Sequence, residues 1–219
     1  DQVGQHAALQ KGQTVIIKIM EKNDPEIQHY EILYSLGGKQ FGQPNPISIL
    51  PAVYGSKQFS YIRDGERYRK TALVMEFIDA KPIREVSCSD LAKYIGRFWK
   101  QLMDGIKSWE APPFEMCHDD LHLANMMMTH NGEARVIDLG KVQWMDEQYL
   151  DLLPPGFAVT GKARLRAKIT RAKDEGMCNF FFDDWFRPWR TLNKEARDRC
   201  GVPTSTAVEA ALANFQDDV

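Results

Sequence analysis

His118-Asp119-Asp120-Leu121-His122-Leu123-Ala124-Asn125 is the stretch that decides the expected fold, together with the acidic turn Asp138-Leu139-Gly140. Asp120 and Asn125 are five residues apart, and Asp138 follows Asn125 by thirteen. Phosphoryl transfer from ATP uses such a set: one carboxylate takes the proton of the attacking hydroxyl, while an amide and a second carboxylate hold Mg²⁺ on the phosphates. The histidine that leads the stretch and the apolar pair before the turn make this combination more specific than its spacing alone.

The composition is that of an ordinary globular protein. The 219 residues are 43% hydrophobic and 26% charged, which is enough for a sizeable core in one domain or two small lobes. The formal net charge is only −2. The sequence therefore excludes functions that depend on a strong overall charge, such as general binding to nucleic acid or to membrane surfaces.

The cysteines and the hydropathy pattern bear on the compartment. The four cysteines, Cys88, Cys117, Cys178 and Cys200, are far apart in the sequence and form no C-x-x-C pair. This spacing predicts free, buried thiols in a reducing compartment, and argues against a zinc site or a disulfide framework. No apolar run approaches the ~18 residues that a membrane helix needs, so no transmembrane segment is expected.

A lysine interrupts the first predicted strand, which covers residues 15–19. Lys18 stands among β-branched apolar residues, and such a lysine is costly to bury unless it is paired. Upstream, Gly4 stands where a glycine-rich phosphate loop would end, although the full G-x-G-x-x-G pattern is absent.

A helix is predicted to follow, with Asp24 as its N-cap, a proline in its first turn and an end near residue 36. It carries two acids, Glu26 and Glu31, and either is close enough in sequence to reach Lys18. Glu31 lies beside the apolar face of the helix, and on this spacing we prefer it as the partner.

Three further elements are predicted from local signals. Asp64-Gly65 predicts a hairpin turn between strands at 57–63 and 67–75, and the second strand runs into a short connector at 76–79. Ser87 and Asp90 resemble a capping box that opens a long amphipathic helix.

A second hairpin is predicted between Asn125 and Asp138, the two expected metal ligands. Asn131-Gly132 is a strong turn signal between strands at 126–128 and 135–137. Because paired strands share their ends, this hairpin is expected to bring Asn125 and Asp138 together.

Residues 162–173 carry six basic side chains and no acid. Such a run forms a solvated helix face or docks an acidic partner, and both interpretations stay open.

Residues 1 to about 150 resemble the protein-kinase-like superfamily. The loop His118-x-Asp120-Leu121-His122-x-x-Asn125 is most similar to that of aminoglycoside and choline phosphotransferases, while the compactness resembles minimal protein kinases that bacteria use as effectors. The resemblance implies an α+β, bilobal fold. It has a small β-rich N-lobe (1–78) with one αC-type helix, and a reduced helical C-lobe (79–219).

The resemblance also implies a nucleotide site with ATP and Mg²⁺ as cofactors. Lys18 would hold the α- and β-phosphates, with Glu31 orienting it and Gly4 ending the phosphate loop. Met75 would be the gatekeeper beside adenine, and adenine would bind the carbonyl of Glu76 and the amide of Ile78.

The catalytic loop receives its roles from the same resemblance. Asp120 would be the catalytic base, and Asn125 and Asp138 would bind Mg²⁺. His122 stands where many protein kinases place a lysine beside the γ-phosphate, and could donate a hydrogen bond there, more effectively if protonated. His118 would brace the loop near Asp138.

The departures from the family pattern concern regulation and the acceptor. Asp119 replaces an arginine that pairs with an activation-loop phosphate in many kinases, and residues 138–155 contain no Ser or Thr. We therefore expect activity without activation-loop Ser/Thr phosphorylation.

The acceptor is left open by the sequence. Our first hypothesis is a Ser/Thr protein kinase of effector type, in the cytoplasm or secreted into a host cytosol. The alternatives are a small-molecule kinase, and a scaffold or nucleotidyl transferase.

Overall fold

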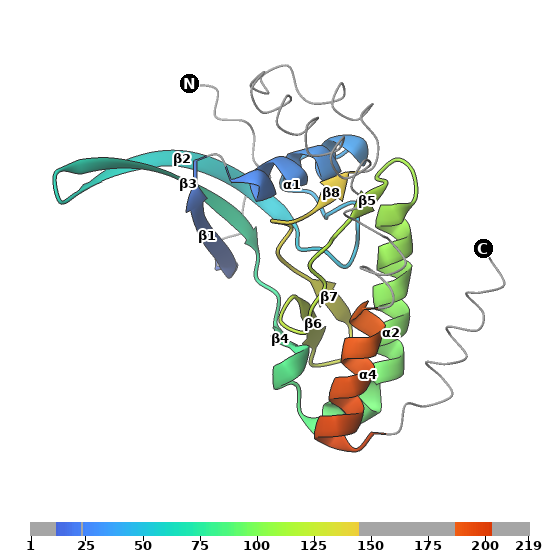
Figure 1. The fold of residues 1–219 in the computed structure, drawn as a ribbon. Coiled ribbons are helices and arrows are strands. Elements are labelled where there is room, and N and C mark those ends of the chain that lie inside the picture. Colours follow the sequence, from blue (N-terminus) through green and yellow to red (C-terminus); the bar gives the residue numbers. More distant parts are fainter. Residues whose placement is uncertain (1–11, 23, 145–186, 203–219) are drawn as a thin grey trace.

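The computed structural model describes residues 12–22, 24–144 and 187–202. Its strands are β1 (Val15–Glu21), β2 (Val53–Arg63), β3 (Glu66–Glu76), β4 (Ala80–Pro82), β5 (Met116–Cys117), β6 (Met126–Thr129), β7 (Ala134–Val136) and β8 (Gln143–Trp144). Its helices are α1 (Pro25–Leu36), a 3₁₀ turn (Ile83–Glu85), α2 (Cys88–Glu110) and α4 (Arg187–Cys200). Small antiparallel sheets and helices are combined in one core, so the predicted α+β class is confirmed (Figure 1).

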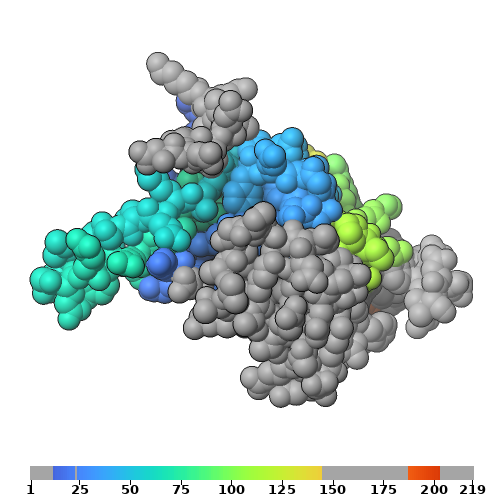
Figure 2. Space-filling model, turned by 90° about the horizontal axis from the view of Figure 1, so that it is seen from above, coloured from blue at the N-terminus to red at the C-terminus, as the bar shows by residue number. Residues whose placement is uncertain are grey.

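The first sheet has the antiparallel order β1-β3-β2. Asp64 and Gly65 both have positive φ, 52° and 80°, as a tight hairpin turn between β2 and β3 requires. The predicted hairpin is confirmed, and its far half projects from the rest of the molecule (Figure 1, Figure 2). In the same sheet Lys18 lies opposite Leu73, so the lysine strand is held directly against β3.

Helix α1 begins where its capping signals predict. The side chain of Asp24 accepts a hydrogen bond from the amide of Glu26 at 3.0 Å, and Pro25 occupies the first turn. One face buries Tyr30, Leu33 and other apolar residues in the core. The helix is thus fixed both by its cap and by its packing.

Helix α2 is the long amphipathic helix expected from the sequence. Ser87 accepts a hydrogen bond from the amide of Asp90 at 3.1 Å, which confirms the predicted cap. Its buried side chains recur every three to four residues and include Leu91, Phe98 and Trp99. Helix α2 packs against β5, β7 and α4, so it supports the strands on either side of the Asp120 loop.

The remaining strands form a sheet β4-β6-β7 and a pair β5-β8. Met126 lies opposite Val136 and Met128 opposite Ala134, and Gly132 in the turn has a φ of 82°. The predicted hairpin around Asn131-Gly132 is therefore confirmed.

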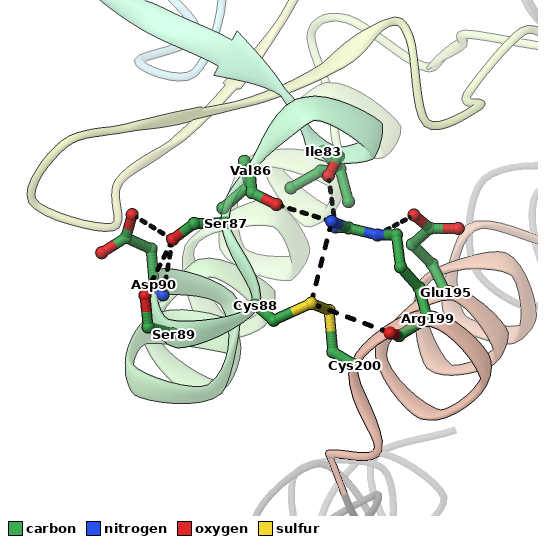
Figure 3. The surroundings of a disulfide bond; sticks show 9 residues. All are labelled: Ile83, Val86, Ser87, Cys88, Ser89, Asp90, Glu195, Arg199 and Cys200. Carbon is green, nitrogen blue, oxygen red and sulfur yellow. Dashed lines mark hydrogen bonds and ion pairs between the residues drawn. A yellow bond between two sulfur atoms is a disulfide. The ribbon is translucent and has the colours of Figure 1, made fainter.

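The prediction of free thiols is wrong. Cys88 and Cys200 form a disulfide although 112 residues separate them, and Cys117 is disulfide-bonded as well. Cys88 begins α2 and Cys200 ends α4, and these helices lie side by side (Figure 1, Figure 3). Sequence spacing missed the bond because it carries no information about which helix ends meet in space.

Arg199 reinforces the same junction. Its guanidinium donates hydrogen bonds to the backbone carbonyls of Val86 at 2.8 Å and Ile83 at 3.3 Å, and pairs with Glu195 (Figure 3). A covalent bond and a polar cluster together hold α4 against the start of α2.

Among the described residues, no helix is long and apolar enough to cross a membrane. Gly4 and the basic run 162–173 lie outside the described residues. The division into lobes at residue 78 stays a prediction.

Candidate functional site

Lys18 is the centre of the candidate site. Its ammonium forms an ion pair with the carboxylate of Glu26 and lies 3.4 Å from Oδ1 of Asp138. Glu26 is on the first turn of α1 and only 2% exposed, while Asp138 follows β7. One lysine thus joins the strand β1, the helix α1 and the acidic turn.

The partner of Lys18 is Glu26, which corrects the preference for Glu31. The amide of Asp24 donates to the carbonyl of Glu21 at 3.1 Å, so the chain turns tightly from β1 into α1. The first helical turn therefore lies beside the lysine strand. Glu31 is five residues farther along the helix. The spacing argument considered the helix face but not the short connection, which was the signal that favoured Glu26.

The pKa values show that the lysine is held as a cation. Partial burial by itself lowers the pKa of Lys18, but the hydrogen bond and charge of Glu26, with those of Asp138, raise it above its ordinary value. Burial raises the pKa of Glu26, and contact with Lys18 offsets this only in part. Lys18 therefore offers a fixed positive charge at neutral pH.

A cavity of about 410 Å³ opens beside this ion pair, a size within the usual range for small-ligand sites. Five of the predicted site residues line it: Lys18, Met75, Glu76, Ile78 and Asp138. The other lining residues are Ile16, Glu26, Pro51, Phe77, Asp79, Ala80, Met127 and Ile137. The structure thus brings the lysine, the connector after β3 and the acidic turn to one hollow.

The side chain of Glu76 anchors the connector. Its carboxylate accepts hydrogen bonds from the amide of Ala52 at 2.9 Å and from the guanidinium of Arg135 at 2.6 Å. These contacts tie the end of β3 to the loop before β2 and to β7. One wall of the cavity is therefore fixed by a pair of polar contacts.

The residues of the loop 118–125 form a hydrogen-bonded network around Asp120. The side-chain nitrogen Nδ2 of Asn125 donates to the backbone carbonyl of Asp120 at 3.0 Å. The backbone amide of His122 donates to the same carbonyl at 3.0 Å. The carboxylate of Asp120 lies 3.0 Å from Nζ of Lys141 and 3.9 Å from Nε2 of His122. The loop is thus held by its own hydrogen bonds, with its carboxylate directed at two nitrogen groups.

Asn125 and Asp138 flank the paired strands β6 and β7. The backbone amide of Ile137 donates to the backbone carbonyl of Asn125 at 3.0 Å, so the residue just before Asp138 is bound directly to Asn125. Asp138 adopts a left-handed φ of 68°, and its Oδ1 accepts from the amide of Gly140 at 3.3 Å. The predicted role of the hairpin, to bring both residues to one end, agrees with this geometry.

The donor set of these two residues fits Mg²⁺. The side-chain nitrogen of Asn125 is engaged by Asp120, so the side-chain oxygen of Asn125 remains to coordinate a metal, and the carboxylate of Asp138 is half exposed. Mg²⁺ takes oxygen ligands, and usually one or two protein groups suffice when substrate phosphates supply others.

His118 is fully buried beneath the loop. Burial lowers its pKa to about 4, and it has a hydrogen bond with the backbone of Ile137. Its ring also lies against that of Trp109, with 5.7 Å between the ring centroids. These contacts agree with the predicted bracing role, because Ile137 directly precedes Asp138.

The segment after the acidic turn is tied to both sides of the site. Gln143 donates to the carboxylate of Asp119 at 2.7 Å, and the indole of Trp144 donates to Nδ1 of His29 on α1 at 2.9 Å. Asp119 thus accepts a hydrogen bond from β8.

The sequence offers Glu26 as the second choice after Glu31, and it does not single out Lys141, which also lies in this site. Lys141 immediately follows the Asp138-Leu139-Gly140 turn, and this adjacency was the available signal.

No family model matches the chain, and no curated protein matches it. The function is therefore argued from the geometry of the site.

Proposed function

We propose that this protein is an ATP- and Mg²⁺-dependent phosphotransferase that moves the γ-phosphate of ATP to a hydroxyl group. The observation that carries the proposal is the position of Lys18, between Glu26 and Asp138 on the wall of the cavity. In protein kinases, the lysine–glutamate ion pair and the metal-binding aspartate must both be in place for transfer. Both contacts are present here in one cluster.

The order of the elements supports a kinase-like, bilobal fold. A lysine strand, a helix with the paired glutamate, a hairpin and a connector precede the long helix α2. The catalytic loop, the β6–β7 hairpin and the acidic turn follow it. This is the order in which kinases present the same groups. The cavity beside the connector offers a place for adenine near Met75, Glu76 and Ile78.

The residues suggest how transfer would proceed. The acceptor hydroxyl gives its proton to Asp120 while its oxygen attacks the γ-phosphorus, and the bond to ADP breaks. Lys18 holds the phosphates, and Glu26 keeps Lys18 in place. Mg²⁺ held by Asn125 and Asp138 would neutralise charge on the phosphate oxygens.

Ser or Thr hydroxyls of a protein are the first proposed acceptor, on the resemblance to minimal effector kinases. A small-molecule acceptor is the second candidate, because the loop containing His122 is most similar to that of aminoglycoside and choline phosphotransferases. The Cys88–Cys200 disulfide favours an oxidising compartment for either activity. This replaces the earlier expectation of a reducing one.

The test is transfer from γ-labelled ATP by the pure, non-reduced protein with Mg²⁺. The acceptors are a lysate of proteins, and separately a panel of amino alcohols and sugars. Label in small molecules alone would overturn the protein acceptor, and label transferred from α-labelled ATP would indicate nucleotidyl transfer.

Asp120→Ala and Asp138→Ala are the matched variants for this test. Because each removes one carboxylate of the reaction, we expect each to lower turnover by about 10²-fold or more without changing the melting temperature. Full turnover in both variants would refute the site.

A further inference from the structure

Two nitrogen groups face the carboxylate of Asp120. Nζ of Lys141 lies 3.0 Å from Oδ1, and Nε2 of His122 lies 3.9 Å from Oδ2. Lys141 follows Gly140 directly and its side chain is 65% exposed. Phosphoryl transfer concentrates negative charge on the three outer oxygens of the moving group, so a cation beside the base has a catalytic use.

The imidazole of His122 is held by a contact within its own loop. Its Nδ1 accepts a hydrogen bond from the amide of Ala124 at 3.2 Å. Its Nε2 lies 3.9 Å from the carboxylate of Asp120, which is longer than a hydrogen bond. His122 therefore makes no hydrogen bond to Asp120 in this arrangement, whereas Lys141 does.

Lys18 does not fill this role either. Its ammonium is engaged by Glu26 and Asp138. Among the residues that the structure describes, Lys141 is the cation in contact with the carboxylate of Asp120.

We propose that Lys141 is a catalytic residue that neutralises the transferring phosphoryl group, in the role that the sequence suggested for His122. This inference rests on the proposed phosphotransfer. An acceptor hydroxyl bound to Asp120 lies within about 2.6–3.2 Å of the carboxylate, and the attacked phosphorus lies about 3–3.5 Å from that hydroxyl. Lys141 touches the same carboxylate, so rotation of its flexible stem brings its ammonium to the phosphoryl oxygens.

Atoms, electrons and protons balance in the proposed transfer step, and Lys141 exchanges none of them. The hydroxyl oxygen forms the new bond to phosphorus, and its proton passes to Asp120. ADP leaves with the electrons of the broken bond. Lys141 gains and loses no proton: it donates hydrogen bonds to the phosphoryl oxygens as their charge develops, and its role is electrostatic.

The first variants are Lys141→Met, which removes the charge, and Lys141→Arg, which keeps it. We expect Lys141→Met to lower kcat by roughly 10²-fold, because loss of one preorganised group that stabilises charge in the transition state has an effect of this size. KM for ATP should change by less than about threefold. Lys141→Arg should keep most of the kcat of the unmodified protein. Lys100→Met is the control, because Lys100 also pairs with an aspartate, Asp104, at 2.8 Å, but on the surface of α2.

The decisive variant restores a cation from the other side of Asp120. We expect His122→Lys combined with Lys141→Met to regain at least tenfold over Lys141→Met alone, because the added ammonium reaches the same phosphoryl group from the loop. A lysine that only braces the loop would not be replaced in this way.

The outcomes separate this inference from the proposed function. If the unmodified protein transfers no label, or if transfer survives Asp120→Ala, the phosphotransferase proposal fails. If transfer depends on Asp120 but Lys141→Met is as active as Lys100→Met, only the role of Lys141 is refuted. Loss in Lys141→Met without recovery by His122→Lys also refutes a phosphoryl-neutralising role.

Discussion

Replacement of Glu26 by glutamine tests the ion pair on which the proposed site depends. The substitution keeps the size of the side chain and removes its charge. Glu26 is 2% exposed and its carboxylate contacts Lys18, whose other acidic contact is Asp138 at 3.4 Å. In Glu26→Gln the lysine keeps one carboxylate and loses the buried one that holds it toward the cavity.

The expected size of the effect follows from the kind of contact that is lost. A hydrogen bond to a charged group contributes about 1.5–3 kcal/mol. If that energy positions Lys18 in the transition state, kcat/KM for ATP falls by about 10- to 150-fold. The pKa of Lys18 moves down towards its ordinary value, because its largest stabilising contact is gone, but the lysine stays charged at neutral pH.

The assay is initial-rate transfer from γ-labelled ATP, with Glu31→Gln as the matched control. Glu31 is on the same helix and burial raises its pKa, but the structure pairs Lys18 with Glu26. We expect Glu31→Gln to remain within about twofold of the unmodified protein, as is usual for a change outside the reacting groups. A loss in Glu31→Gln with full activity in Glu26→Gln would refute the assignment.

Two further predictions concern stability. The double variant Cys88→Ser, Cys200→Ser should lose about 2–5 kcal/mol of unfolding free energy in urea denaturation, because the disulfide closes a loop of 112 residues. An unchanged midpoint of the urea transition would show that the disulfide does not stabilise the fold. Burial lowers the pKa of His118 to about 4. Between pH 6.5 and 4 the unfolded chain therefore binds the proton and the folded chain does not, so this group reduces stability by about 2 kcal/mol at pH 5. His118→Gln should flatten that part of the stability–pH curve, whereas the exposed His130 is the control: an equal effect of His130→Gln would contradict the assignment.

Much of the fold was predictable because its signals are local. Asp24-Pro25 begins α1, Asp64-Gly65 turns the long hairpin and Ser87 caps α2, as expected. Each of these features depends on the backbone preferences or hydrogen bonds of residues that are neighbours in the chain. A sequence contains that information directly.

The parts of the candidate site that lie on one local element could be predicted from the sequence. The hairpin between Asn125 and Asp138 follows from its turn signal, and β6 and β7 pair as the antiparallel strands of that hairpin. The choice between Glu26 and Glu31 failed, because it depends on how closely α1 follows β1 rather than on the helix itself. Lys141 was missed because its contact with Asp120 spans 21 residues and requires the acidic turn to lie against the catalytic loop.

By itself, the sequence determined the elements, their turns and the set of polar groups available for chemistry. Tertiary structure decided which of these groups meet: Lys18 and Asp138 are 120 residues apart, and Cys88 and Cys200 are 112 apart, yet each pair is in contact. The physical reason is that propensities and caps act over a few residues. Ion pairs and disulfides depend instead on distances through space, which the packing of β1, α1, α2 and α4 on one core establishes.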